Sequence, residues 1–132
     1  DVLKNSPNGM PGDDDVGAMS ALYVFSALGI YPYLPGEAGF TVTGPLFEKT
    51  TISLDNGKKI TIDGKNAEFD APYIQEMKIN GKNVSSLWLD WNALSQGGAI
   101  EFKMGKNPNK KWGSAVKDIP PTYYPEKKQS LE

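Results

Sequence analysis

Three consecutive aspartates, Asp13 to Asp15, stand where a run of helix-forming residues begins, in the stretch GMPGDDDVGAMSALYVFSAL (residues 9–28). One interpretation is helix capping, because an aspartate side chain accepts hydrogen bonds from the first amides of a helix. The other is acid–base chemistry. The free amides and the positive end of the helix dipole favour an ionised carboxylate. Such aspartates are suited to act as a base and poorly suited to act as a proton-donating acid.

The composition narrows the chemistry further. The chain has 132 residues, a net charge of −2, no histidine and no cysteine. Imidazole and thiolate chemistry are therefore excluded, and any metal ion would need oxygen ligands. An EF-hand does not fit, because its alternating ligands and its twelfth-position glutamate are missing. Without a basic block, neither nucleic acid nor a membrane is expected as a partner. The cellular compartment stays open.

The aspartates precede a predicted helix at residues 14–28, with Asp13 or Asp14 as its N-cap and Gly29 as the residue that ends it. Apolar residues cover well over half of its circumference: Val16, Met19, Leu22, Tyr23, Val24, Phe25 and Leu28. A helix of this kind requires burial on nearly all sides.

The following residues have the alternation typical of β-strands, at 40–43, 50–54, 58–62, 73–79, 86–89 and 99–104. Asn56-Gly57 and Asn80-Gly81 predict hairpins, and the first is expected to form a type I′ turn. The pattern predicts a mainly β fold, a small antiparallel β-sandwich preceded by one N-terminal helix. Residues 114–132 are expected to be extended or disordered.

The predicted β-domain is too small to bury the predicted helix. The helix requires neighbours on most of its sides, and a small sandwich covers only one of them. The sequence therefore predicts that this chain is the C-terminal part of a larger protein.

Residues 9–36 resemble the signature of the glycoside hydrolase family 92 exo-α-mannosidases. In that signature, Gly-x-Pro-Gly-Asn/Asp-Asp/Glu-Asp-x-Gly-x-Met-Ser-Ala leads into a helix, followed by Tyr-Pro and Pro-Gly. The resemblance continues to about Gly113 through GPLF (44–47), NGKKITI (56–62), YIQEMKINGK (73–82), GGAIEFKM (97–104) and PNKKWG (108–113). Two departures are Leu22, where the family commonly has tryptophan, and TGP at 43–45 in place of GSP.

The resemblance implies that residues 1–36 are a loop and the last helix of an (α/α)₆ catalytic barrel, and that residues 37–113 are a C-terminal β-sandwich region. It implies a calcium-dependent, inverting enzyme that removes terminal mannose from glycans, with α-1,2 linkages expected. Asp13 and Asp15 would hold and deprotonate the attacking water, with Asp15 the stronger candidate. The catalytic acid and most calcium ligands would lie upstream. No tightly bound calcium is expected on this chain alone.

An alternative from another class is a β-sandwich that binds carbohydrate, or another partner, and has no catalytic role. Such a module has no need for the Asp-x-Asp at the helix start. Trp88, Trp91 and Trp112 could form a sugar-stacking platform, although a core role is the commoner use of aromatic residues in a β-sandwich.

The isolated chain is expected to be inactive and to self-associate through its exposed helix.

Overall fold

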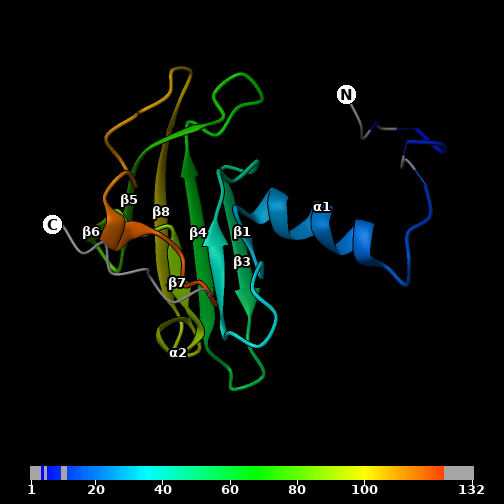
Figure 1. Cartoon of the computed structure of the whole chain (residues 1–132), viewed down its shortest axis with the longest axis horizontal. Coiled ribbons are helices and arrows are strands. Elements are labelled where there is room, and N and C mark those ends of the chain that lie inside the picture. The colour runs from blue at the N-terminus through cyan, green and yellow to red at the C-terminus, as the bar shows by residue number, and fades with distance from the viewer. Residues whose placement is uncertain (1–3, 5, 10–11, 124–132) are drawn as a thin grey trace, which may run out of the picture.

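The computed structural model describes residues 4, 6–9 and 12–123. Two β-sheets pack together, and one long helix, α1 (Ala18–Leu28), extends away from them (Figure 1). This arrangement confirms the mainly β fold with one N-terminal helix.

The larger sheet has the strand order β3-β4-β8-β5-β6. Its strands are β3 (Lys49–Ser53), β4 (Lys59–Lys65), β5 (Tyr73–Ile79), β6 (Lys82–Val84) and β8 (Gly98–Gly105). Strand β8 lies between β4 and β5, and it runs parallel to β4 and antiparallel to β5. The sheet is therefore mixed, which corrects the prediction of a wholly antiparallel sandwich.

The smaller sheet is antiparallel, with the order β1-β2-β7. It consists of β1 (Ile30–Tyr31), β2 (Gly39–Val42) and β7 (Trp88–Asp90). A short helix, α2 (Trp91–Leu94), follows β7, and the Asp90 side chain caps it by accepting a hydrogen bond from the Asn92 amide at 2.7 Å.

The two Asn-Gly pairs that were predicted to form hairpins do so, with different turns. Asn80 and Gly81 have φ values of 49° and 77°, as a type I′ turn between β5 and β6 requires. In the β3–β4 hairpin only Gly57 is left-handed, with φ 78°, so the predicted type I′ turn is wrong there. The Asn56 side chain instead accepts a hydrogen bond from the Lys58 amide at 3.0 Å.

The core lies between the sheets and consists of alternate residues of the central strands. The buried cluster contains Ile30, Ile60, Ile62, Ala67, Met77, Leu89, Leu94, Ile100, Phe102 and Met104. Helix α1 adds little to it, since Ala27 is the one fully buried residue of this helix. The core therefore belongs to the β-domain.

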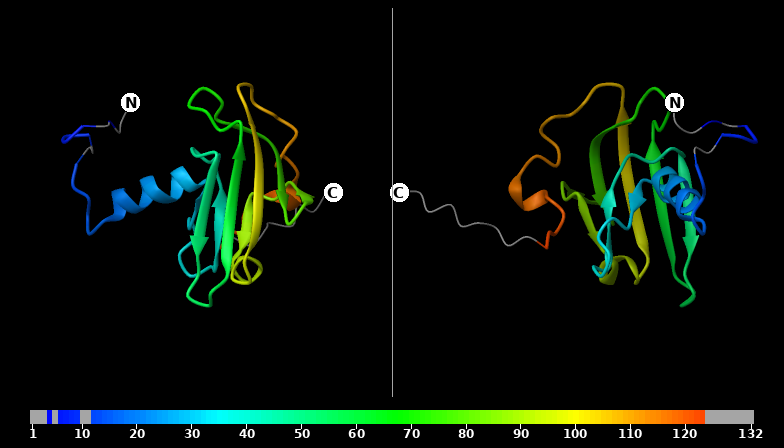
Figure 2. Two further views of the ribbon diagram at one scale, coloured as in Figure 1. Left: turned by 180° about the vertical axis from the view of Figure 1, so that it is seen from behind. Right: turned by 45° about the vertical axis from the view of Figure 1, so that its right-hand side comes forward.

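Only the C-terminal end of α1 packs against the sheets, as the left view of Figure 2 shows. Phe25 stacks on Phe40 of β2 with 6.1 Å between ring centroids. Val16 before the helix, and Tyr23 and Val24 within it, are 110%, 51% and 55% exposed. This exposure confirms that the β-domain leaves part of the apolar helix surface uncovered. In the part of the chain that the structure describes, no helix is long and apolar enough to span a bilayer.

Residues 114–123 of the segment predicted to be extended or disordered contain a single helical turn, η1 (Val116–Asp118). Asp118 is buried, where its carboxylate accepts a hydrogen bond from the Ser85 hydroxyl at 2.9 Å. This hydrogen bond explains why the turn differs from the prediction. Residues 124–132 lie outside the described residues.

The exposed surface of α1 predicts self-association of the 132-residue chain. Each large apolar side chain left in water forgoes about 1.5–3 kcal/mol, and a contiguous apolar patch promotes association. Sedimentation should show concentration-dependent oligomers that the double variant Tyr23→Lys, Val24→Lys abolishes. Tyr33→Lys, at a side chain 66% exposed outside the helix, is the matched control and should have no effect. A monomer at every concentration, with α1 amides strongly protected from exchange, would contradict this prediction.

Candidate active site at the acidic turn

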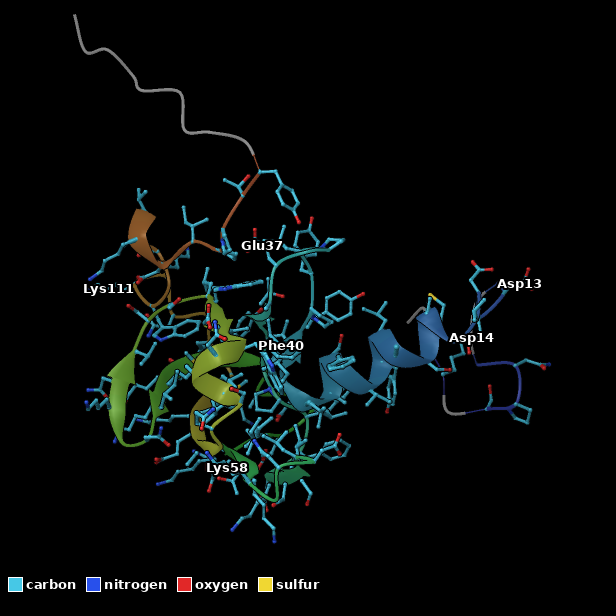
Figure 3. All side chains as sticks on the ribbon, turned by 90° about the horizontal axis from the view of Figure 1, so that it is seen from below. Asp13, Asp14, Glu37, Phe40, Lys58 and Lys111 are labelled. Carbon is cyan, nitrogen blue, oxygen red and sulfur yellow. The ribbon has the colours of Figure 1, made fainter. Side chains whose placement is uncertain are left out.

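Residues 13–17, the acidic turn, lie at the outer end of α1, away from the sheets (Figure 3). Asp15, Val16 and Gly17 have consecutive left-handed φ values of 44°, 62° and 89°. A left-handed conformation costs a residue other than glycine about 1–2 kcal/mol, and it is least expected for a β-branched valine. Strained backbone of this kind is typical of functional sites.

Oxygen atoms of the acidic turn accept hydrogen bonds from the first residues of the helix. The backbone carbonyls of Asp15 and Asp14 accept hydrogen bonds from the Ala18 and Met19 amides at 3.3 and 3.4 Å. The Asp14 side chain accepts two more from Ser20, one from its amide to Oδ1 and one from its hydroxyl to Oδ2, both at 2.8 Å. Both carboxylate oxygens of Asp14 are thereby fixed to the helix.

The N-cap of α1 is Gly17, with no side-chain cap, and the helix begins at Ala18. The prediction that the helix begins at Asp14, with Asp13 or Asp14 as its N-cap, is therefore wrong. The left-handed residues before Ala18 prevent an earlier start. Asp14 still binds a first-turn amide from outside the helix. The Ser20 amide, and then the Ser20 hydroxyl, lower the pKa of Asp14 below its usual 3.8.

Asp13 and Asp15 are placed differently from Asp14. Both are exposed, and their carboxylates form no hydrogen bond or ion pair among the described residues. Free helix amides were expected to face these carboxylates, but the first two amides of α1, those of Ala18 and Met19, are bonded to backbone carbonyls. The Asp14 carboxylate is thus anchored, whereas the carboxylates of Asp13 and Asp15, the two residues expected to act on water, are free.

The acidic turn does not form a calcium site by itself. In residues 4, 6–9 and 12–123, no three or more acidic, histidine or cysteine side chains converge as a metal site would require. A calcium ion normally takes six to eight oxygen ligands. The acidic side chains of the described residues therefore do not form a complete calcium site by themselves.

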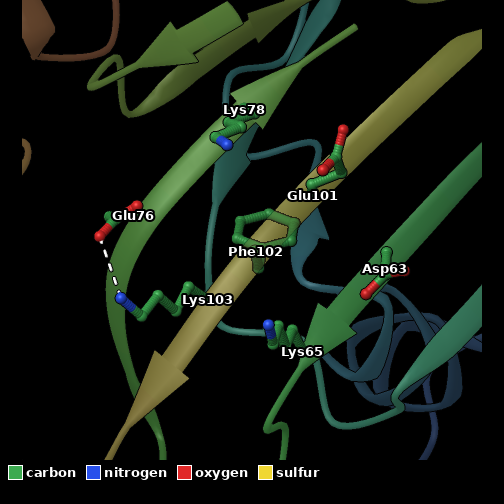
Figure 4. A pocket seen from close by; sticks show the side chains of 7 residues that line it. All are labelled: Asp63, Lys65, Glu76, Lys78, Glu101, Phe102 and Lys103. Carbon is green, nitrogen blue, oxygen red and sulfur yellow. Dashed lines mark hydrogen bonds and ion pairs between the residues drawn. The ribbon is translucent and has the colours of Figure 1, made fainter. Parts of the chain in front are cut away.

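A second concentration of charge lies on the solvent face of the larger sheet, around a hollow of about 360 Å³ (Figure 4). Its charged residues are Asp63, Lys65, Glu76, Lys78, Glu101 and Lys103. Lys103 and Glu76 pair across the strands at 3.2 Å. Sequence reasoning missed this face, although acid and lysine alternate two residues apart along β4, β5 and β8. Opposite charges face each other between β5 and β8, whereas like charges do so between β4 and β8, so cross-strand pairing explains only part of this face.

In the described part of the chain, the three tryptophans have different surroundings. Trp112 packs against the core and donates a hydrogen bond from Nε1 to the Val84 carbonyl at 3.1 Å. Trp91 is 38% exposed, meets Phe40 edge to face at 6.2 Å and lines a different hollow from that of Trp112. The side chain of Trp88 packs against Gly39.

The lowered pKa of Asp14 predicts a pH dependence of the helix start. Because the folded pKa lies below 3.8, the stabilisation is complete above the unfolded value and is lost as the pH falls through the folded one. The Ser20 amide should lose protection from exchange in that acidic range. In Asp14→Asn, the protection of this amide should not vary across the same range. Protection in the unaltered chain that falls no further than in Asp14→Asn as the pH is lowered would contradict the contact.

Comparisons with known proteins place the chain in a family. The model of the glycosyl hydrolase family 92 catalytic domain matches residues 1–106. An uncharacterized secreted glycosidase of Arthroderma benhamiae is 33% identical over 125 residues, which cover 91% of this chain and 16% of that protein.

Two solved structures from Bacteroides thetaiotaomicron are similar over most of the chain. A family GH92 α-mannosidase in complex with mannoimidazole is 30% identical, with a TM-score of 0.87, over 92% of this chain and 16% of its own. A family GH92 inverting mannosidase is 35% identical, with a TM-score of 0.85, over 92% of this chain and 17% of its own. The chain thus spans about one sixth of the length of these relatives, and it belongs to glycoside hydrolase family 92.

Proposed function

We propose that this chain is part of an inverting exo-α-mannosidase and contributes its water-activating carboxylates. The observation that carries the proposal is the state of the acidic turn, where Asp13 and Asp15 are free while Asp14 is anchored. Family membership and the named mannosidase relatives supply the reaction class. Because the chain spans 16% of the first relative's length, the remaining parts of the site are assigned to the rest of the protein.

Inversion requires two carboxyl groups on opposite faces of the sugar, about 6.5–9.5 Å apart, with a water molecule between one of them and the anomeric carbon. Asp15 is proposed to accept the proton of that water as it attacks, and Asp13 to orient the water through a hydrogen bond. A free, exposed carboxylate can do both when substrate and the rest of the protein surround it. The leaving oxygen is protonated by an acid outside this chain.

Two finer statements belong to the proposal. The whole enzyme is expected to require calcium, with its ligands mainly outside the described residues, and no step by Asp13 or Asp15 is derived from that ion. The preferred substrate is expected to be a terminal α-1,2-linked mannose. Both expectations rest on the resemblance to family 92.

The test is an assay of the full-length protein on α-1,2-, α-1,3-, α-1,4- and α-1,6-linked mannobiosides. NMR should detect β-mannose as the first product, because one displacement inverts the anomeric centre. Hydrolysis should be fastest for the α-1,2 linkage, and chelation should abolish it until calcium is returned. Initial release of α-mannose would contradict the mechanism. Binding of mannosides without hydrolysis would favour the non-catalytic alternative.

A further inference from the structure

We infer that Ser20 and Asp14 are a positioning pair that sets the location of the Asp15 carboxylate, and that Asp14 is not itself a base. This inference rests on the proposed function. It assigns different roles to three adjacent and chemically identical residues, and it gives Ser20 a positioning role that acts through Asp15.

The first argument is the occupancy of Asp14. Each of its carboxylate oxygens accepts one hydrogen bond from Ser20, at 2.8 Å in both cases. Charge-assisted hydrogen bonds from two donors of the same residue fix the orientation of the carboxylate. Accepting a proton would require Asp14 to weaken these bonds, which agrees with the direction of its pKa shift. Asp14 is thus suited to anchoring and unsuited to proton transfer.

The second argument is the strained backbone that follows Asp14. Asp15 and Val16 have φ values of 44° and 62°, a conformation that residues other than glycine keep only when surrounding contacts impose it. Val16 imposes nothing itself, because its side chain is entirely exposed. The contacts that close the turn run from the Asp14 side chain and the carbonyls of Asp14 and Asp15 to the helix.

These contacts determine the position of a base. If the Asp14 side chain were released, the left-handed residues could relax and the Asp15 carboxylate would move relative to α1. A displacement of about 1 Å can lower a catalysed rate by about 10²-fold. A helix-capping role alone would instead change the stability of α1 and leave turnover unaffected.

The test uses matched variants of the full-length enzyme. Asp14→Asn keeps the geometry, because the amide oxygen accepts from the Ser20 backbone and the amide nitrogen donates to the Ser20 hydroxyl. We expect its kcat to stay within about 3-fold of the unaltered enzyme, by contrast with a loss of about 10²-fold in Asp14→Ala. KM should change little in either variant. Ser20→Ala should lower kcat by a smaller factor, and Ser20→Thr should restore it.

The pH profile separates a positioning role for Asp14 from a role as the base, whereas the loss of kcat in Asp14→Ala separates it from simple helix capping. The acidic limb of kcat/KM should keep its midpoint in Asp14→Asn, since the base is another group. Asp15→Asn is the comparison. If Asp14→Asn loses as much activity as Asp15→Asn, Asp14 is catalytic and the inference is wrong. The inference is also wrong if Asp14→Ala turns over normally, because Asp14 then neither catalyses the reaction nor positions the base. An inactive unaltered enzyme would instead refute the proposed function, and the positioning role with it.

Discussion

Asp15→Asn in the full-length enzyme is expected to lower kcat by about 10²- to 10⁴-fold, the usual contribution of a general base. The amide cannot accept the proton of the attacking water. Folding should be unchanged, because the Asp15 side chain is exposed and makes no hydrogen bond among the described residues. Initial-rate kinetics on a mannobioside, together with thermal unfolding of both proteins, would measure the two effects separately.

The matched control is Asp55→Asn in the β3–β4 hairpin. Asp55 is also exposed, and the structure records no hydrogen bond or ion pair for its side chain among the described residues. This variant should have unaltered kcat, which shows that loss of one surface charge is not the cause. Asp13→Asn should also lower kcat. Turnover near that of the unaltered enzyme in Asp15→Asn would remove the base assignment.

The parts of the fold that the sequence predicts correctly depend on local signals. The strand at 73–79 and the stop at Gly29 follow from alternation and from the left-handed preference of glycine, and the structure has both. The insertion of β8 between β4 and β5 depends on pairing between residues such as Ile62 and Ile100, far apart in sequence. No local pattern specifies which distant strands pair, so the parallel pair was not predicted.

The candidate site shows the same division. Type and spacing identify Asp13 to Asp15 as the residues of interest, but not which of the three is anchored. That choice depends on the Ser20 amide and hydroxyl, which only the folded helix brings to Asp14. The late helix start was equally hidden, because valine ordinarily disfavours the left-handed φ of 62° that Val16 adopts.

The largest effect is expected for the 132-residue chain alone, which should hydrolyse no mannoside. Its core holds the β-domain together, while the acidic turn lies at the end of a helix that extends away from that domain (Figure 1). Asp13 and Asp15 provide at most one of the two carboxyl groups that inversion requires on opposite sides of the sugar. Mannose release by the purified chain, with and without calcium, can be followed on the mannobiosides used for the full-length enzyme.

A second substrate separates the two possible reasons for this inactivity. An aryl mannoside with a strongly acidic phenol as leaving group needs no general acid, so an enzyme lacking only its acid would still hydrolyse it. We expect this chain not to hydrolyse the aryl mannoside either. The base alone neither binds the sugar nor orients the water, and this positioning supplies much of the rate. Hydrolysis of the activated substrate alone would show that the acidic turn binds mannose unaided. Hydrolysis of both substrates would show that the chain contains a complete active site.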